Sequence, residues 1–209
     1  GDEVVDFDSG LLNAEGRDVV VIGGGDTAMD CVRTAIRQKA NSVTCLYRRD
    51  RANMPGSQRE VANAEEEGVD FRWLSAPQAF RGDNHVRAVQ AQKIHLGQPD
   101  ATGRQVPQII EDSSHEIQAD LVIKALGFDP EDIPTMFGAP ELKVSKWGTI
   151  GVDWRTMMTN LPGVFAAGDI VRGASLVVWG VRDGRDAAES IHSYIMAQSE
   201  VPLVAAAGA

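Results

Sequence analysis

The stretch that decides the fold is DVVVIGGGDTA, residues Asp18–Ala28. Its first half is a continuous β-branched run, typical of a central strand buried on both faces, so we expect a parallel sheet covered by helices on each side. Three glycines end the run, and from Asp26 to Lys39 the apolar residues recur at helical spacing. Thr27 and Asp30 form a T-x-x-D pair that could cap this helix. Strand, glycine turn and helix together predict an α/β fold of the Rossmann type.

The glycine turn, Gly23 to Ala28, matches the pattern G-x-G-x-x-A. Gly23 makes the tight turn, Gly25 lets the backbone approach a pyrophosphate, and Ala28 lets helix and strand pack closely. The amino end of the helix offers N–H groups and a positive dipole to the same anion. The pattern therefore predicts a dinucleotide site, and the alternative is a glycine-rich turn needed only for geometry.

A second strand, Ser42–Tyr47, ends in the stretch LYRRD. In NAD sites an acidic residue follows this strand, whereas in NADP sites an arginine meets the 2′-phosphate. Arg48 lies 25 residues after Gly23, and no acid stands at this point. We expect Arg48 and Arg49 to clamp the 2′-phosphate and to favour NADPH by up to ~3–6 kcal/mol. The alternative is a solvated basic loop paired with nearby acids.

The remaining chain contains signals for both kinds of sheet. A helix is expected from about Gln58 to Glu67 and a third strand from Val69 to Leu74. Residues 78–118 partly alternate between apolar and polar and predict an antiparallel meander with one wet face, its turns including GQPDATG, before a buried strand at Asp120–Leu126. In the last third we expect short strands at Thr149–Val152 and Val164–Ala167 and a helix beginning near Val178.

Composition narrows the possible partners and cofactors. The chain has 209 residues, a net charge of −10 and 43% hydrophobic residues, which argues against nucleic acid or an anionic membrane as a partner. We find no apolar window long enough for a membrane span and no secretory signal. The two cysteines form no C-x-x-C, and the four histidines are scattered. These features predict no metal site and a cytoplasmic location.

The segment GVFAAGDIVRGASLVVWGVRDGRDAAESI, Gly163–Ile191, carries a resemblance to a known family. Together with VVVIGGGDTAMDC and LYRRDRANMPGS, it resembles the two-dinucleotide-domain flavoprotein reductases, and within them the small (β) subunits of NADPH-dependent glutamate synthase. The resemblance extends over roughly residues 17–197. It implies an enzyme that passes a hydride from NADPH to FAD, with no acid or base residue required.

The resemblance also implies which residues bind the cofactors. Asp169 would bind the ribityl or phosphate part of FAD, and Val177 and Val178 would present backbone groups to the pyrimidine edge of the flavin. The stretch Ala125–Phe128 resembles the A-x-G junction between the two domains. The full set of implied cofactor-binding residues is Gly23, Gly24, Gly25, Asp26, Thr27, Ala28, Arg48, Arg49, Gly127, Gly168, Asp169, Ser175, Val177 and Val178.

Domain organisation and partners follow from the same resemblance. It implies a lead-in from the FAD domain at residues 1–16, an NADPH-binding domain at 17–125, the C-terminal part of a FAD-binding domain at 126–197, and a tail at 198–209. In the family, [4Fe–4S] clusters and a first FAD-binding glycine motif lie in an N-terminal region that is missing here. The electrons would pass through those clusters to a large (α) subunit that forms glutamate.

A thioredoxin reductase is excluded because it needs a C-x-x-C motif, which the chain lacks. Three other functions remain open at this point. A reductase of the ferredoxin or adrenodoxin type would share the same cofactors but serve a different acceptor. A non-catalytic NADPH-binding module, or a structural domain that kept a Rossmann shape, would not need the second, flavin-like motif.

Overall fold

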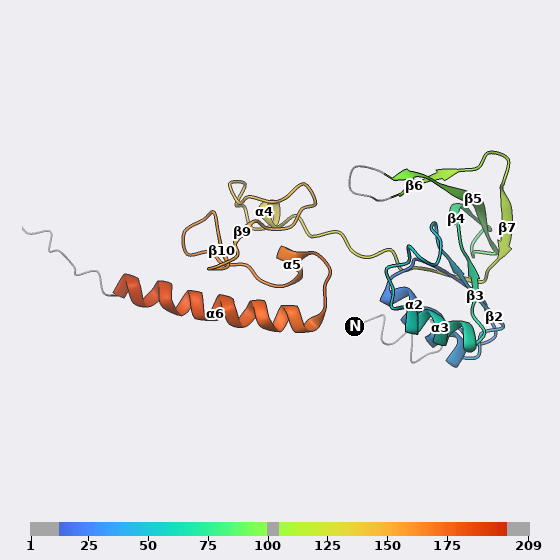
Figure 1. Cartoon of the computed structure of the whole chain (residues 1–209), viewed down its shortest axis with the longest axis horizontal. Coiled ribbons are helices and arrows are strands. Elements are labelled where there is room, and N and C mark those ends of the chain that lie inside the picture. The colour runs from blue at the N-terminus through green and yellow to red at the C-terminus, as the bar shows by residue number, and fades with distance from the viewer. Residues whose placement is uncertain (1–12, 100–104, 200–209) are drawn as a thin grey trace, which may run out of the picture. The chain divides into compact units, whose positions relative to one another are not determined.

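The computed structural model describes residues 13–99 and 105–199, which form two compact units, Gly1–Gly127 and Phe128–Ala209 (Figure 1). Most of the predicted tail, most of the lead-in and most of the predicted GQPDATG turn lie outside the described residues. The chain passes from the first unit to the second between Gly127 and Phe128.

The first unit is built on a four-stranded parallel sheet in the order β3-β2-β1-β8. The chain runs from β1 through a helix to β2 on one side, then returns to the other side of β1 as β8. The crevice at the carboxyl ends of such strands, where the order reverses, is the usual ligand site of this architecture. The strands are β1 (Asp18–Ile22), β2 (Ser42–Leu46), β3 (Asp70–Arg72) and β8 (Leu121–Lys124).

Two helices, α2 (Asp26–Arg37) and α3 (Gln58–Glu66), cover one face of this sheet (Figure 1). Val19 and Val21 of β1 belong to the same buried cluster as Met29 of α2. The helix follows the glycine turn directly, as its 3.6-residue apolar spacing predicts. This confirms the predicted strand, glycine turn and helix.

The opposite face is covered by an antiparallel sheet, and here the expectation of helices on both sides is wrong. Val20 and Ile22 of β1 pack in one cluster with Val89 and Ala91 of the second sheet. A continuous apolar run shows that both faces are buried, but it does not specify what buries them. The predicted meander is confirmed, with strands β4 (Ser75–Arg81), β5 (Ala88–Pro99), β6 (Gln105–Ile109) and β7 (His115–Gln118).

The second unit has little regular sheet. Its buried cluster centres on Leu142, Ile150 and Val171. The expected strand Val164–Ala167 forms only an isolated bridge from Phe165 to Met158, and Ile150 likewise bridges Val144. The elements are α4 (Ile133–Met136), β9 (Val152–Asp153), β10 (Met158–Thr159), α5 (Asp169–Arg172) and α6 (Val177–Ser199).

The predicted strand Thr149–Val152 is thus reduced to the bridge at Ile150 and the first residue of β9, and the predicted strand Val164–Ala167 is wrong. A helix begins at Val177, close to the predicted position. A strand needs a partner along its length, and local apolar runs do not reveal whether one is present. Over the part of the chain that the structure describes, no helix is both long and apolar enough to cross a bilayer.

Candidate functional site

The glycine turn joins the carboxyl end of β1 to the amino end of α2. Gly23 has φ of 151°, and a Cβ atom there would lie 2.2 Å from the carbonyl oxygen of Ala125. A Cβ on Gly24 would lie 2.3 Å from the ring of Tyr47. These two positions are therefore glycine because the protein's own packing requires it.

Gly25 differs from both of its neighbours. Its φ of −89° is accessible to any residue, and a Cβ built there would meet nothing within 4 Å. Neither backbone conformation nor packing thus calls for glycine at this position. Open space directly in front of a backbone is what a closely approaching phosphate needs, so the turn fits a dinucleotide pyrophosphate.

The amino end of α2 carries no side-chain cap, and the predicted role for Thr27 and Asp30 is wrong. Gly25 is the N-cap residue, so Asp26 already lies in the first helical turn. The Asp26 carboxylate accepts a hydrogen bond from the backbone N–H of Ser57 at 2.9 Å. No described side chain satisfies the N–H groups of Asp26 and Thr27, which leaves these two for a ligand, whereas the N–H of Ala28 donates to the carbonyl oxygen of Gly25 at 3.0 Å.

The loop after β2 packs against the glycine turn and is hydrogen-bonded to it. The N–H of Gly56 donates to the carbonyl oxygen of Gly24 at 2.9 Å, and Asp26 binds Ser57 as described above. A Cβ on Gly56 would lie 3.1 Å from the same carbonyl oxygen, so a larger residue there would need the loop or the turn to shift by a few tenths of an ångström. The MPGS stretch thus helps to fix the conformation of the glycine turn.

A cavity of about 650 Å³ opens in front of the turn at the carboxyl ends of the parallel strands. It brings together the carboxyl ends of β1 and β2, the segment that follows β8, and the first residues of β4. Arg48 lines it, is exposed, and has no hydrogen bond or ion pair with any described residue. The lining residues are Ile22, Gly23, Gly24, Gly25, Thr27, Leu46, Tyr47, Arg48, Pro55, Ser75, Ala76, Pro77, Ala125, Leu126 and Gly127.

The structure separates the two adjacent arginines. The Arg49 side chain is buried, with only 8% of the residue exposed, and its Nη2 donates to the carbonyl oxygen of Gln105 at 3.2 Å. Arg49 does not line the cavity, nor do Asp26 and Ala28. Both arginines lie after β2, which ends at Leu46, and their side chains diverge there. Of the predicted two-arginine clamp, only Arg48 lines the cavity in this structure.

Several residues of the cavity were not identified from the sequence. Ser75, Ala76 and Pro77 reach it because Leu74 adopts φ of 49°, where the chain leaves β3 for the antiparallel sheet. The N–H groups of Leu74 and Ser75 donate to the carbonyl oxygens of Arg49 and Tyr47, in the segment that follows β2. Leucine is rarely found in this conformation, so no sequence signal marks the turn.

Both cysteines of the chain are free thiols. Burial raises the pKa of Cys45 to about 12, and its Sγ contacts the carbonyl oxygen of Gly23 at 3.5 Å. Burial, with a smaller effect of the Asp30 charge, also raises the pKa of Cys31. A thiol with a raised pKa is a poor nucleophile, so both cysteines serve packing rather than disulfide chemistry.

In the second unit, Asp169 lines a cavity of about 730 Å³ with Gly173 and Ala174. The Asp169 side chain is exposed and makes no hydrogen bond with a described residue. Aromatic rings, those of Phe128, Phe137, Trp147 and Phe165, form much of the remaining wall. A free carboxylate beside small residues and aromatic walls fits a cofactor with a hydroxyl chain and a flat ring, as FAD has.

The other residues implied in FAD binding lie outside this cavity. Ser175, Val177 and Val178 are exposed at the start of α6, with 83% of Val177 accessible to solvent. Gly168 has φ of 78° and serves as the N-cap of α5, so a non-glycine residue would be strained there. The structure thus places Asp169 in a cavity and leaves the start of α6 uncovered.

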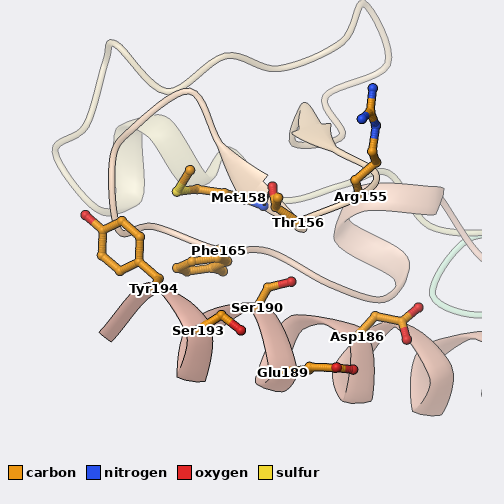
Figure 2. Close-up of a pocket in the computed structure, with 9 residues that line it drawn as sticks. All are labelled: Arg155, Thr156, Met158, Phe165, Asp186, Glu189, Ser190, Ser193 and Tyr194. Atoms are coloured by element: carbon orange, nitrogen blue, oxygen red, sulfur yellow. Dashed lines mark hydrogen bonds between the residues drawn. The ribbon is translucent and has the colours of Figure 1, made fainter. Parts of the chain in front are cut away.

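A third cavity, of about 610 Å³, lies between α6 and the segment 155–165 (Figure 2). The rings of Phe165 and Tyr194 contact edge to face, with 5.8 Å between their centroids. The carboxylates of Asp186 and Glu189 extend from α6 (Figure 2). None of the predicted site residues lines it. Within residues 13–99 and 105–199, no group of three or more His, Cys, Asp or Glu side chains is arranged to hold a metal ion.

Comparisons with known proteins agree with this geometry. The family described as pyridine nucleotide-disulphide oxidoreductase matches residues 2–198. Glutamate synthase [NADPH] small chain of Azospirillum brasilense is 69% identical over 207 residues, which are 99% of this chain and 43% of that protein. The protein of the same name from Escherichia coli (strain K12) is 44% identical, over 90% of this chain and 41% of its own length.

Solved structures give the same fold. Thioredoxin reductase of Lactococcus lactis superposes with a TM-score of 0.72 and 25% identity, over 92% of this chain and 57% of that chain. The present chain spans less than half the length of the two curated relatives above.

Proposed function

Because the chain belongs to the pyridine nucleotide-disulphide oxidoreductase family, we propose that it is the NADPH-oxidising part of a glutamate synthase small subunit. The observation that carries this proposal is the combination, in one cavity, of an open Gly25 with an Arg48 that pairs with no described residue. The first fits a pyrophosphate and the second a 2′-phosphate. The same arrangement would serve any reductase that takes its hydride from NADPH.

In the first unit, the cavity would hold NADPH with its pyrophosphate on the glycine turn. Gly25 and the uncapped first turn of α2 would supply backbone N–H donors, and Thr27 lies on the same wall. Arg48 would bind the 2′-phosphate through its planar fork. One charge-assisted contact is worth about 1.5–3 kcal/mol, or roughly 10- to 150-fold in affinity. This free energy is half of the ~3–6 kcal/mol expected from two arginines.

In the second unit, we propose that Asp169 orients the ribityl chain of FAD and that the start of α6, with Ser175, Val177 and Val178, faces the ring. The positive end of a 23-residue helix would stabilise negative charge there. FAD, when bound, supplies the acceptor for the hydride of NADPH. The protein's part is to hold the two cofactors and to exclude water, because hydride transfer needs no acid or base group.

The iron–sulfur clusters do not fit this chain. A [4Fe–4S] cluster needs four thiolates, whereas the chain has two cysteines, both with raised pKa values. We therefore propose that any clusters are held outside these 209 residues. The name shared by the relatives, small chain, supports a large subunit as the partner that forms glutamate.

The test is selective binding of NADPH, measured by calorimetry at matched ionic strength. We expect NADPH to bind more tightly than NADH, and Arg48→Ala to remove most of that difference, about 10- to 150-fold, without changing the affinity for NADH. Arg59→Ala is the matched control, since Arg59 is exposed on α3 and lies outside the cavity. Equal affinity for NADPH and NADH in the unmodified protein would contradict the proposal.

A further inference from the structure

An ion pair in the second unit links α5 to α6. Arg172, the last residue of α5, donates from Nε to Oδ2 of Asp183 at 2.5 Å and from Nη2 to Oδ1 at 2.7 Å. Only 1% of Asp183 is exposed to solvent, although many large apolar side chains of the same unit are exposed. A carboxylate buried to this extent is stable only with partners that satisfy both oxygens.

The guanidinium of Arg172 also packs against two indole rings. It lies 4.9 Å from the ring centroid of Trp154, which stands between β9 and β10, and 4.9 Å from that of Trp179, in the first turn of α6. Arginine suits such a place because its flat cation stacks on rings while its edge bonds a carboxylate. One side chain thus ties three elements of the second unit together.

The Arg172–Asp183 ion pair lies next to both segments that are proposed to bind FAD. The backbone N–H of Arg172 donates to the carbonyl oxygen of Gly168 at 3.0 Å, and Gly168 directly precedes Asp169. The side-chain hydrogen bond and the charge of Arg172 hold the pKa of Asp183 below its ordinary value, so it is ionised at neutral pH. At the other end, Trp179 belongs to the helical turn that begins at Val177.

We propose that Arg172 and Asp183 are positioning residues of the FAD site, fixing the Gly168–Asp169 turn relative to the start of α6. The inference rests on the proposed function of the second unit. Neither residue lines the cavity that contains Asp169, although Ile170 and Gly173, on either side of Arg172, do. A buried ion pair adds little to stability compared with an apolar pair of similar size, whereas its fixed geometry suits the orientation of a neighbouring site.

The experiment uses the full-length protein, stripped of flavin and titrated with FAD while flavin fluorescence and visible absorption are recorded. Asp183→Asn removes the charge but keeps the shape, and we expect FAD affinity to fall at least tenfold, with an altered absorption envelope of the bound flavin. NADPH affinity, measured by calorimetry, should stay within twofold. Glu189→Gln is the matched control, an exposed carboxylate on the same helix, and should change neither quantity.

Two further variants separate positioning from folding. Arg172→Lys keeps the charge without the fork, and should recover part of the FAD affinity that Arg172→Met loses. The double variant Arg172→Met/Asp183→Leu replaces the ion pair by apolar side chains, so it should keep the thermal stability but not the FAD affinity.

The outcomes distinguish this inference from the function on which it rests. If Asp183→Asn or the folded double variant binds FAD with unmodified affinity and spectrum, the positioning role is overturned while FAD binding stands. If the unmodified full-length protein binds no FAD, the FAD part of the proposed function fails, and the positioning role fails with it.

Discussion

The two units of this chain differ in how they use their apolar residues. In the first, both faces of β1 are buried, with Val21 and Val20 packed on opposite sides of the sheet. In the second, Phe128 is 92% exposed and Phe137 75% exposed, although the unit has a small buried cluster of its own. Large apolar side chains left in water usually mark a surface that something else covers. The first unit therefore has a complete core, whereas the second presents a surface suited to a cofactor or further chain.

The largest expected effect comes from the glycine turn of the first unit. Gly23→Ala would place a Cβ 2.2 Å from a backbone oxygen at positive φ, and backbone cannot move aside as a side chain can. We expect a loss of about 4 kcal/mol or more in the free energy of unfolding, measured by denaturant titration. Hydrogen exchange should locate the loss in residues 13–99 and not in the second unit.

Gly25→Ala provides the contrast, because a Cβ there meets no protein atom. Stability should change by less than about 1 kcal/mol, while NADPH affinity falls at least tenfold because the methyl group occupies the path of the pyrophosphate. If Gly25→Ala instead destabilised the fold as much as Gly23→Ala, the open space would have a structural rather than a ligand-binding origin.

A pair of truncations tests the difference in packing directly. Met29→Ala removes a side chain of which 1% is exposed and should cost about 2–5 kcal/mol, whereas Phe128→Ala should stay within about 0.5 kcal/mol of the unmodified chain. Thermal unfolding followed by circular dichroism measures both. A comparable loss for Phe128→Ala would show that the second unit already buries this ring.

These differences also explain what the sequence could predict. The strand, turn and helix from Asp18 onward follow from local patterns, the β-branched run and the glycine spacing, and the structure has them. The antiparallel cover on the second face depends on β5, some 70 residues further along, and no local pattern encodes that contact. The pairing of Arg172 with Asp183 depends on the path of the loop between two helices, which sequence spacing does not give.

Among the residues of the candidate site, too, some are predictable from local sequence patterns and others depend on distant contacts. Gly23, Gly25 and Arg48 are recognisable because the chemistry of a dinucleotide demands them at that spacing. For Arg49 the sequence suggests a role shared with its identical neighbour, whereas in the structure its buried side chain donates to Gln105, a contact that no local pattern encodes. The strained turn at Leu74 has no signature at all, since its conformation is imposed by contacts with the segment that follows β2.

The smallest expected effect concerns the ionic contact between α2 and α3. Arg33 and Arg37 hydrogen-bond the Glu67 carboxylate, and these bonds, that from Arg33 most, hold the pKa of Glu67 below its ordinary value. Because the folded-state pKa is lowered, this contribution to stability is fully present above the unfolded-state pKa and is lost as pH falls through the folded-state pKa.

Denaturant unfolding between roughly pH 5 and pH 3, read at Trp73 in the first unit, should therefore depend less steeply on pH in Glu67→Gln than in the unmodified chain. Glu66→Gln is the matched control, because Glu66 is exposed and adjacent. The pKa of Asp183 is lowered in the same sense, so acid should also weaken the second unit, and hydrogen exchange would assign each loss to its unit. An unchanged slope in Glu67→Gln would mean that Arg33 and Arg37 hold the helices together without favouring the charged form of this carboxyl group.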